Sequence, residues 1–218
     1  MDLLDFKNYI IDFDGTIFNS IGFWYESPKL YLKQKNIEAK IGLIDRIEVF
    51  DTLNTAHILN EEYNLGMTDE ETLEDMIKFI VNNYVNLNLC DNSLDLIKLL
   101  KENNKNVYIL TASPRLYVEP AIKKNNLDKY IDGFVSCEDN NTSKSDGTAF
   151  INMLKMYNLN INDTLVIDDS KEAIRALNKL NIKSIAVKSD FYGIDSKIKD
   201  ITLLYEYMPN IYKKFKKI

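Results

Sequence analysis

Acidic residues follow an apolar run near the start of the chain, at a spacing that suits metal and phosphate chemistry. Residues 9–11 are apolar, as expected of a buried strand; Asp12 follows them directly, with Asp14 two positions later. Two carboxylates buried together need a cation, and aspartate oxygens are suitable ligands for Mg²⁺. Gly15 permits a sharp turn close to a bound anion, and Thr16 adds a hydroxyl donor. A capped turn with two solvated acids is the alternative interpretation.

Further polar side chains lie at or near the ends of later apolar runs. In chain order they are Thr111, Lys144, Asp168 and Asp169. The second half of the chain alternates short apolar runs with helical patterns, which predicts the α/β fold class with a doubly wound parallel sheet. Because parallel strands end at one edge of a sheet, we expect these side chains to meet Asp12 in one cleft. Each residue alone has an ordinary interpretation, as a helix cap or a loop lysine.

A helical pattern directly after the first strand predicts a second domain. Residues 18–87 read as helices throughout, and Thr68 with Glu71 forms a capping box for one of them. We therefore expect a core domain made of residues 1–17 and 88–218, with a helical domain inserted between the two segments.

Three local expectations concern helix boundaries. Asp45 is expected to cap a helix that carries Phe50. Pro120 should bend or break the helix in which it lies. The tail from about Ile198 should be helical and pack on the sheet.

Composition limits the class of protein. The 218 residues are 45% hydrophobic and 28% charged, as in globular proteins, and the net charge of −6 argues against nucleic acid as a main partner. No apolar run approaches the ~20 residues that a membrane span requires, and the N-terminus lacks the features of a signal peptide. Cys90 and Cys137 have neither disulfide nor metal spacing, which favours a cytoplasmic protein.

The order of these residues resembles the four motifs of the haloacid dehalogenase superfamily. Residues 12–16 resemble the first motif, Asp-x-Asp-Gly-Thr/Val, and residues 109–113 resemble the second, a strand ending in Ser or Thr. Residues 144–147 resemble the third, usually Lys-Pro-Asp, although Ser145 replaces the proline and loosens the expected placement of the lysine. Residues 166–170 resemble the fourth. The helical insert is similar to the small cap domain of the first cap type.

The resemblance implies a phosphatase that acts on a small phosphorylated metabolite. Asp12 would attack phosphorus and form an aspartyl-phosphate, which divides one difficult displacement into two. Asp14 would protonate the leaving group and later act as the base for water. The residues expected to bind the phosphoryl group are Thr111, Ala112 and Lys144.

The resemblance also implies Mg²⁺ as the cofactor. Its protein ligands would be the Asp12 carboxylate, the Asp14 backbone carbonyl and the Asp169 side chain. Asp168 would make a weaker contact or orient a metal-bound water. An aspartate at position 14 favours a phosphate ester over a haloacid as the substrate.

Other functions share parts of this pattern. A sugar-phosphate phosphomutase would use the same residues, a silent ligand-binding protein would share the scaffold, and a signalling receiver domain would place its acidic pair at the first strand. Sugar phosphates, phosphoglycolate and nucleotide monophosphates all remain open as substrates, and we expect a monomer or weak dimer. His57, the single histidine, is interpreted as a half-buried residue of the insert, and residues 23–25 as its packing core.

Overall fold

The chain forms two compact units. The computed structural model describes residues 2–47, 51–191 and 196–216. Contacts between backbone positions define the units, which are Met1–Asn19 with Asn88–Ile218, and Ser20–Leu87. Among the described residues, no helix is both long and apolar enough to cross a membrane.

The insert begins two residues later than the sequence suggested. Phe18 lies in the first unit because its ring stacks on Phe13, with centroids 5.0 Å apart, and its N–H donates to the Phe13 carbonyl (2.8 Å). Asn19 N–H donates to the Asn88 carbonyl (3.0 Å), so the two connections to the insert are hydrogen-bonded to each other.

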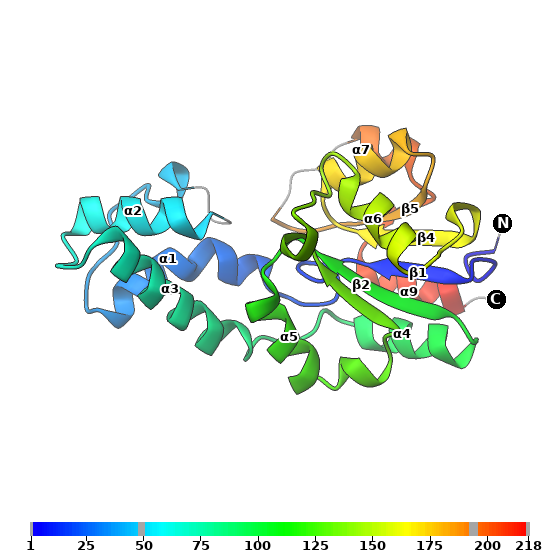
Figure 1. The fold of residues 1–218 in the computed structure, drawn as a ribbon, viewed down its shortest axis with the longest axis horizontal. Coiled ribbons are helices and arrows are strands. Elements are labelled where there is room, and N and C mark those ends of the chain that lie inside the picture. The colour runs from blue at the N-terminus through cyan, green and yellow to red at the C-terminus, as the bar shows by residue number, and fades with distance from the viewer. Residues whose placement is uncertain (1, 48–50, 192–195, 217–218) are drawn as a thin grey trace. The chain divides into compact units, whose positions relative to one another are not determined.

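The first unit is built around a parallel sheet (Figure 1). Within the described residues the sheet has six strands in the order β3-β2-β1-β4-β5-β6, and all neighbours are parallel. The predicted doubly wound parallel sheet is therefore confirmed. The strands are β1 Asn8–Ile11, β2 Asn106–Thr111, β3 Gly133–Ser136, β4 Thr164–Asp168, β5 Lys183–Val187 and β6 Leu204–Glu206.

Helices cover both faces of the sheet, with α4, α5 and α9 on one side and α6 and α7 on the other (Figure 1). The helices of this unit are α4 Ser93–Glu102, α5 Arg115–Lys124, α6 Thr148–Met156, α7 Lys171–Lys179, α8 Ser196–Ile201 and α9 Met208–Lys216. Alternate strand residues face opposite layers. Ile10 and Val166 pack with Phe150 of α6, whereas the Tyr9 ring meets Phe215 of α9 at 6.0 Å between centroids.

The register of the central strands determines which residues leave the sheet together. Ile11 at the end of β1 pairs with Ile109 of β2 on one side and with Ile167 of β4 on the other. The residues that follow Ile11 and Ile167 are Asp12 and Asp168. They therefore emerge side by side at the carboxyl edge of the sheet.

The second unit is helical. Its helices are α1 Ile21–Gln34, α2 Thr52–Tyr63 and α3 Asp69–Tyr84. Phe23 and Trp24 are buried against Tyr84 of α3, with ring centroids 6.2 and 5.6 Å from it, as expected of a packing core. Thr68 and Glu71 form the predicted capping box.

Several local expectations were wrong. Asp51, not Asp45, caps α2 by accepting a hydrogen bond from Asn54 N–H (3.0 Å), because Asp45 lies in a short 3₁₀ turn; Phe50 falls outside the described residues. Pro120 does not break its helix, because α5 continues through it. His57 is exposed rather than half-buried.

The tail also contains a strand that the sequence did not predict. β6 pairs with β5 along three residues before α9 begins, so the tail extends the sheet as well as covering it.

Candidate active site

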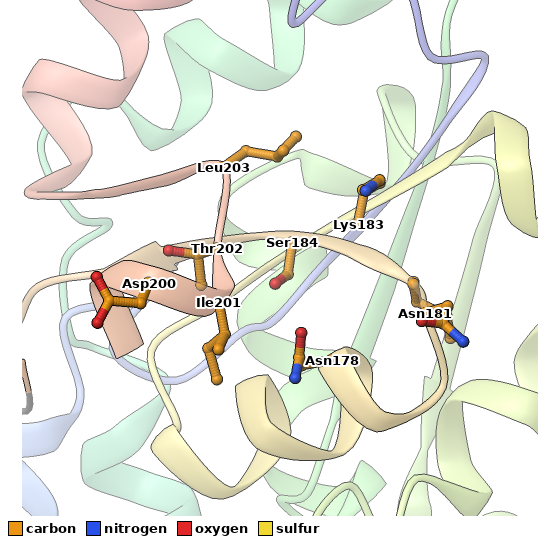
Figure 2. Close-up of a pocket in the computed structure, with 9 residues that line it drawn as sticks. Asn178, Asn181, Lys183, Ser184, Asp200, Ile201, Thr202 and Leu203 are labelled. Carbon is orange, nitrogen blue, oxygen red and sulfur yellow. The ribbon is translucent and has the colours of Figure 1, made fainter. Parts of the chain in front are cut away.

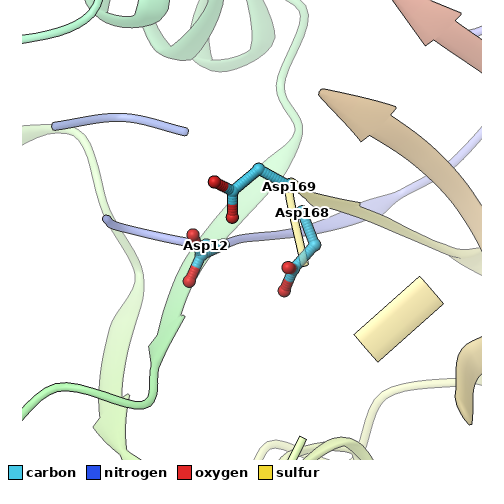
Figure 3. Close-up of side chains that lie close together, drawn as sticks. All are labelled: Asp12, Asp168 and Asp169. Carbon is cyan, nitrogen blue, oxygen red and sulfur yellow. The ribbon is translucent and has the colours of Figure 1, made fainter. Parts of the chain in front are cut away.

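Three carboxylates meet at the carboxyl ends of β1 and β4 (Figure 3). One oxygen each from Asp12, Asp168 and Asp169 lies within 4.8 Å of the other two. Asp12 follows β1 directly, and its N–H donates to the Ile167 carbonyl (2.9 Å), which fixes its backbone to β4. The side chains of Asp12 and Asp168 are almost completely buried.

Lys144 pairs with two of these acids. It is 7% exposed, and its Nζ donates to Asp12 Oδ1 and to Asp168 Oδ2, the latter at 2.9 Å. The other Asp168 oxygen, Oδ1, accepts from Ser170 N–H (2.8 Å). Asp169 differs, because its Oδ2 is buried without a hydrogen-bond partner among the described residues. Asp169 is thus the carboxylate whose oxygen is available to a ligand.

The charges of the site explain its pKa values. Burial raises the pKa of Asp12 to about 7; the Lys144 charge opposes this rise, and the charges of Asp168 and Asp14 add to it. Burial and the neighbouring acids Asp12 and Asp168 raise the pKa of Asp169 well above its usual value. Burial alone would lower the pKa of Lys144, but its two carboxylate partners raise it. The three carboxylates of Asp12, Asp168 and Asp169 share the single ammonium group of Lys144. The negative charge of the acids is therefore only partly balanced, whereas the positive charge of the lysine is fully balanced.

These residues fit a divalent cation. With all side chains ionised, Asp12, Asp168, Asp169 and Lys144 together carry a charge of −2. A buried carboxylate oxygen without a partner is unfavourable, and three aspartates provide the hard oxygen ligands that Mg²⁺ prefers.

Asp14 and Thr111 form a second part of the site. The Thr111 hydroxyl lies 3.4 Å from Asp14 Oδ2 and accepts from Ser113 N–H (3.0 Å). Thr111 is fully buried at the end of β2, Asp14 is half-buried, and Ala112 is exposed in the loop that follows. Gly15 has a φ of +79°, which a side chain would disfavour, so the glycine allows the chain to turn after Asp14.

The Asp14 carboxylate lies outside the three-acid cluster. The structure brings all the expected acids and Lys144 to one sheet edge. The third motif already included Ser145 and Asp146, whereas Ser143 and Thr148 were not singled out, although the density of Ser, Thr and Asp around positions 142–148 was a usable signal.

A separate cavity of about 260 Å³ lies elsewhere in the first unit (Figure 2). It is formed by the end of α7, the start of β5 and the turn between α8 and β6. Ser184, on β5, is 2% exposed, and its hydroxyl has no hydrogen-bond partner among the described residues. None of the predicted site residues lines this cavity.

Comparison with known proteins identifies the family. Residues 9–187 match the sequence model described as haloacid dehalogenase-like hydrolase. The chain belongs to this family. The resemblance read from the sequence motifs is thereby confirmed.

Individual relatives are distant. Over 182 residues the chain is 22% identical to PpaX, a proposed pyrophosphatase of Caldanaerobacter subterraneus subsp. tengcongensis; the match covers 82% of this chain and 80% of PpaX. The crystal structure of a proposed β-phosphoglucomutase from Thermotoga maritima is 16% identical, with a TM-score of 0.86 over 97% of this chain and 99% of the other.

The structure of YfnB, a proposed haloacid dehalogenase-type hydrolase of Bacillus subtilis, was determined with bound magnesium and described as revealing interdomain movement. It is 17% identical, with a TM-score of 0.76 over 97% of this chain and 99% of YfnB. These low identities show a shared fold. The chain is thus an enzyme of a hydrolase family, and similar structures are named as proposed phosphatases and a phosphomutase.

Proposed function

We propose that the protein is a magnesium-dependent phosphatase that hydrolyses a small phosphate monoester through an aspartyl-phosphate on Asp12. The observation that carries the proposal is the cluster of Asp12, Asp168 and Asp169 with Lys144 bonded to the first two. A nucleophilic role for Asp12 is supported by the buried ammonium beside its carboxylate, and a metal site is supported by the two further carboxylates close to it.

The chain's own side chains can perform both chemical steps. In the first step an Asp12 oxygen bonds to phosphorus while Asp14 donates a proton to the departing alkoxide. In the second step Asp14 takes a proton from water, the water oxygen bonds to phosphorus, and the Asp12–phosphorus bond breaks. Lys144 stays next to Asp12 in both steps and stabilises the negative charge of the transferring group.

The loop after β2 supplies hydrogen-bond donors for the phosphoryl oxygens. The donors are the Thr111 hydroxyl and the backbone N–H of Ala112. The Thr111 hydroxyl has a single proton, so donation to phosphate would replace its long contact with Asp14. That exchange would release Asp14 toward the leaving group as substrate binds.

Asp12, Asp169 and the Asp14 carbonyl are the proposed protein ligands of Mg²⁺. When bound, Mg²⁺ would supply the positive charge that allows Asp12 to approach an anionic phosphate. Both oxygens of Asp168 already have protein partners, so we assign it the weaker role.

The Ser20–Leu87 unit is proposed to be the cap that selects the substrate. YfnB, which shares the fold, is described as showing interdomain movement. Sugar phosphates, phosphoglycolate and nucleotide monophosphates are the candidate substrates. A cytoplasmic location is proposed because Cys90 and Cys137 are free thiols.

A screen of phosphorylated metabolites with Mg²⁺ tests the proposal, with Asp12→Asn as the inactive control because an amide cannot form the acyl phosphate. Turnover by wild type and its loss in Asp12→Asn are expected. No turnover of any ester, or wild-type rates in the variant without deamidation, would contradict it.

A phosphomutase is the second candidate, favoured by the similarity in fold to the proposed β-phosphoglucomutase. The phosphorylated enzyme distinguishes the two. Capture of the phosphoryl group by water indicates a phosphatase, whereas capture by an added sugar phosphate indicates a mutase.

A further inference from the structure

Lys144 lies in a loop in which hydrogen bonds connect the residues before it to the residues after it. Ser143 N–H donates to Thr148 Oγ1 (2.9 Å), and Ala149 N–H donates to the Ser143 carbonyl (3.0 Å). The N–H and hydroxyl of Thr148 both donate to Asp146 Oδ1, at 2.8 and 2.7 Å. The hydroxyl of Thr148 therefore links the residue before Lys144 to Asp146, two residues after it.

Ser145 occupies the position in this loop where a turn is most easily made rigid. Gly147 N–H donates to the Lys144 carbonyl (3.2 Å), which closes a four-residue turn with Ser145 as its second residue. Ser145 N–H donates to Ser143 Oγ (3.2 Å), and the two hydroxyl oxygens are 2.8 Å apart. Proline is favoured at the second position of such turns because its ring fixes φ. Here hydrogen bonds provide a restraint that a proline ring would provide covalently.

Lys144 depends on the backbone that carries it. Its side chain is buried between Asp12 and Asp168, and ordering a long lysine side chain costs conformational entropy. A shift of about 1 Å at a reacting group can reduce a rate by as much as about a hundredfold. A loop that moved would therefore weaken both of the lysine's contacts.

We propose that the polar side chains of this loop are positioning residues that hold Lys144 against Asp12 and Asp168. The residues of this lysine-loop network are Ser143, Ser145, Asp146 and Thr148. The inference deepens the proposed function and rests on it only for the activity measurement described below.

Chemical labelling of Lys144 tests the proposal without reference to activity. Thr148 is exposed, so Thr148→Val keeps the shape and removes only the hydroxyl. We expect an amine-acylating reagent, followed by mass spectrometry, to modify Lys144 about tenfold faster in this variant than in wild type. Thr148→Ser keeps the hydroxyl and should label as wild type does. Thr202→Val is the matched control. The Thr148 hydroxyl lies 3.3 Å from the Ser143 carbonyl, and the Thr202 hydroxyl likewise donates to a carbonyl, that of Ile198 (3.1 Å), but Thr202 lies outside the loop.

Proline rescue distinguishes positioning from a general loss of stability. The single variant Ser145→Pro should leave Lys144 protected from the reagent. In the double variant Thr148→Val/Ser145→Pro the labelling rate of Lys144 should return to within about twofold of the wild-type rate. Thermal midpoints of all variants are measured alongside. Equal labelling of Thr148→Val and wild type, exposure of Lys144 by Ser145→Pro alone, or failure of the double variant to restore protection would each overturn the proposal.

Activity provides the second measurement. With a phosphate ester substrate, kcat of Thr148→Val should fall about tenfold with KM changed less than about twofold, and the double variant should recover most of kcat. If labelling behaves as expected and wild type hydrolyses no phosphate ester, the positioning role stands and the proposed function fails. If wild type is active and the labelling rates do not change, the opposite holds.

Discussion

The burial of Asp12 should make the metal-free protein less stable as the pH rises. The pKa of this carboxyl group is 3.8 in the unfolded chain, and burial raises it to about 7 in the fold despite the opposing charge of Lys144. A group with a higher pKa in the folded state contributes stability that is fully present below the unfolded value. That contribution is lost as the pH rises through the folded value. The slope is about 1.4 kcal/mol per pH unit well below the folded pKa and falls close to it, so the loss is about 2 kcal/mol between pH 5 and pH 7 and approaches about 3 kcal/mol by pH 8.

The variant Asp12→Asn isolates this effect because its amide does not ionise. The difference in unfolding free energy between the variant and wild type should grow by about 3 kcal/mol in favour of the variant from pH 5 to pH 8. This figure is a minimum, because removing the Asp12 charge also lowers the raised pKa of Asp169. The hydrogen bond to Asp69 raises the pKa of His57, but His57 is present in both proteins, so its effect cancels in the difference between them.

Urea unfolding followed by circular dichroism, in the presence of a chelator, measures the difference at each pH. Asp200→Asn, which removes an exposed carboxylate of α8 outside the site, is the control for the loss of one acidic side chain. Excess Mg²⁺ should remove most of the growth seen with Asp12→Asn, because the cation balances the carboxylates of the wild-type site. A difference between Asp12→Asn and wild type that stays constant from pH 5 to pH 8 in chelator would refute the reasoning.

Three further predictions follow from the same geometry. Asp14→Asn should slow phosphorylation of the enzyme by alkyl phosphate esters about a hundredfold. Esters of acidic phenols should be affected much less, because a good leaving group needs little protonation. Burst kinetics measure this step, and equal losses for the two kinds of ester would count against the acid role. Asp169→Ala should raise the Mg²⁺ concentration needed for half-maximal activity about tenfold. Asp168→Ala should raise it less, since both oxygens of Asp168 already have protein partners. An unchanged Mg²⁺ requirement in Asp169→Ala would mean that the ligand is wrongly assigned. Ser184→Ala should raise the unfolding free energy by about 1 kcal/mol, because it removes a buried hydroxyl that has no hydrogen-bond partner in the described part of the chain. A decrease on urea unfolding would contradict this.

The central sheet could be predicted because its strands are short, continuous apolar runs that end at polar residues. Such runs between helical segments have few arrangements other than a parallel sheet with right-handed crossovers. The strand β6 could not be predicted in this way, since Leu204–Glu206 is three residues long and half-buried. Its backbone forms a strand because β5 offers a free edge, and that is a property of the assembled sheet.

The helix caps show a similar limit at short range. Asp45 and Asp51 both precede helical patterns, and both residue types cap helices well. Only the backbone decides between them: Asp51 accepts from Asn54 N–H, whereas Asp45 lies within a 3₁₀ turn. Capping by Thr68 was easier to predict because Glu71 makes a reciprocal bond that the spacing reveals.

In the candidate site, the spacing of the residues predicted their types, whereas the different roles of the two adjacent acids came only from the family resemblance. Asp168 and Asp169 are chemically identical neighbours, so spacing alone cannot say which one would bind a cation. Placement in the fold separates them: β4 buries Asp168 between Lys144 and Ser170 N–H, while Asp169 keeps a buried oxygen without a partner among the described residues. The pairing of Asp168 with Lys144 supports a role for Asp168 in holding the lysine, and the unpartnered oxygen of Asp169 supports its proposed role as a metal ligand. We therefore expect the alanine variants of these two acids to fail in different ways.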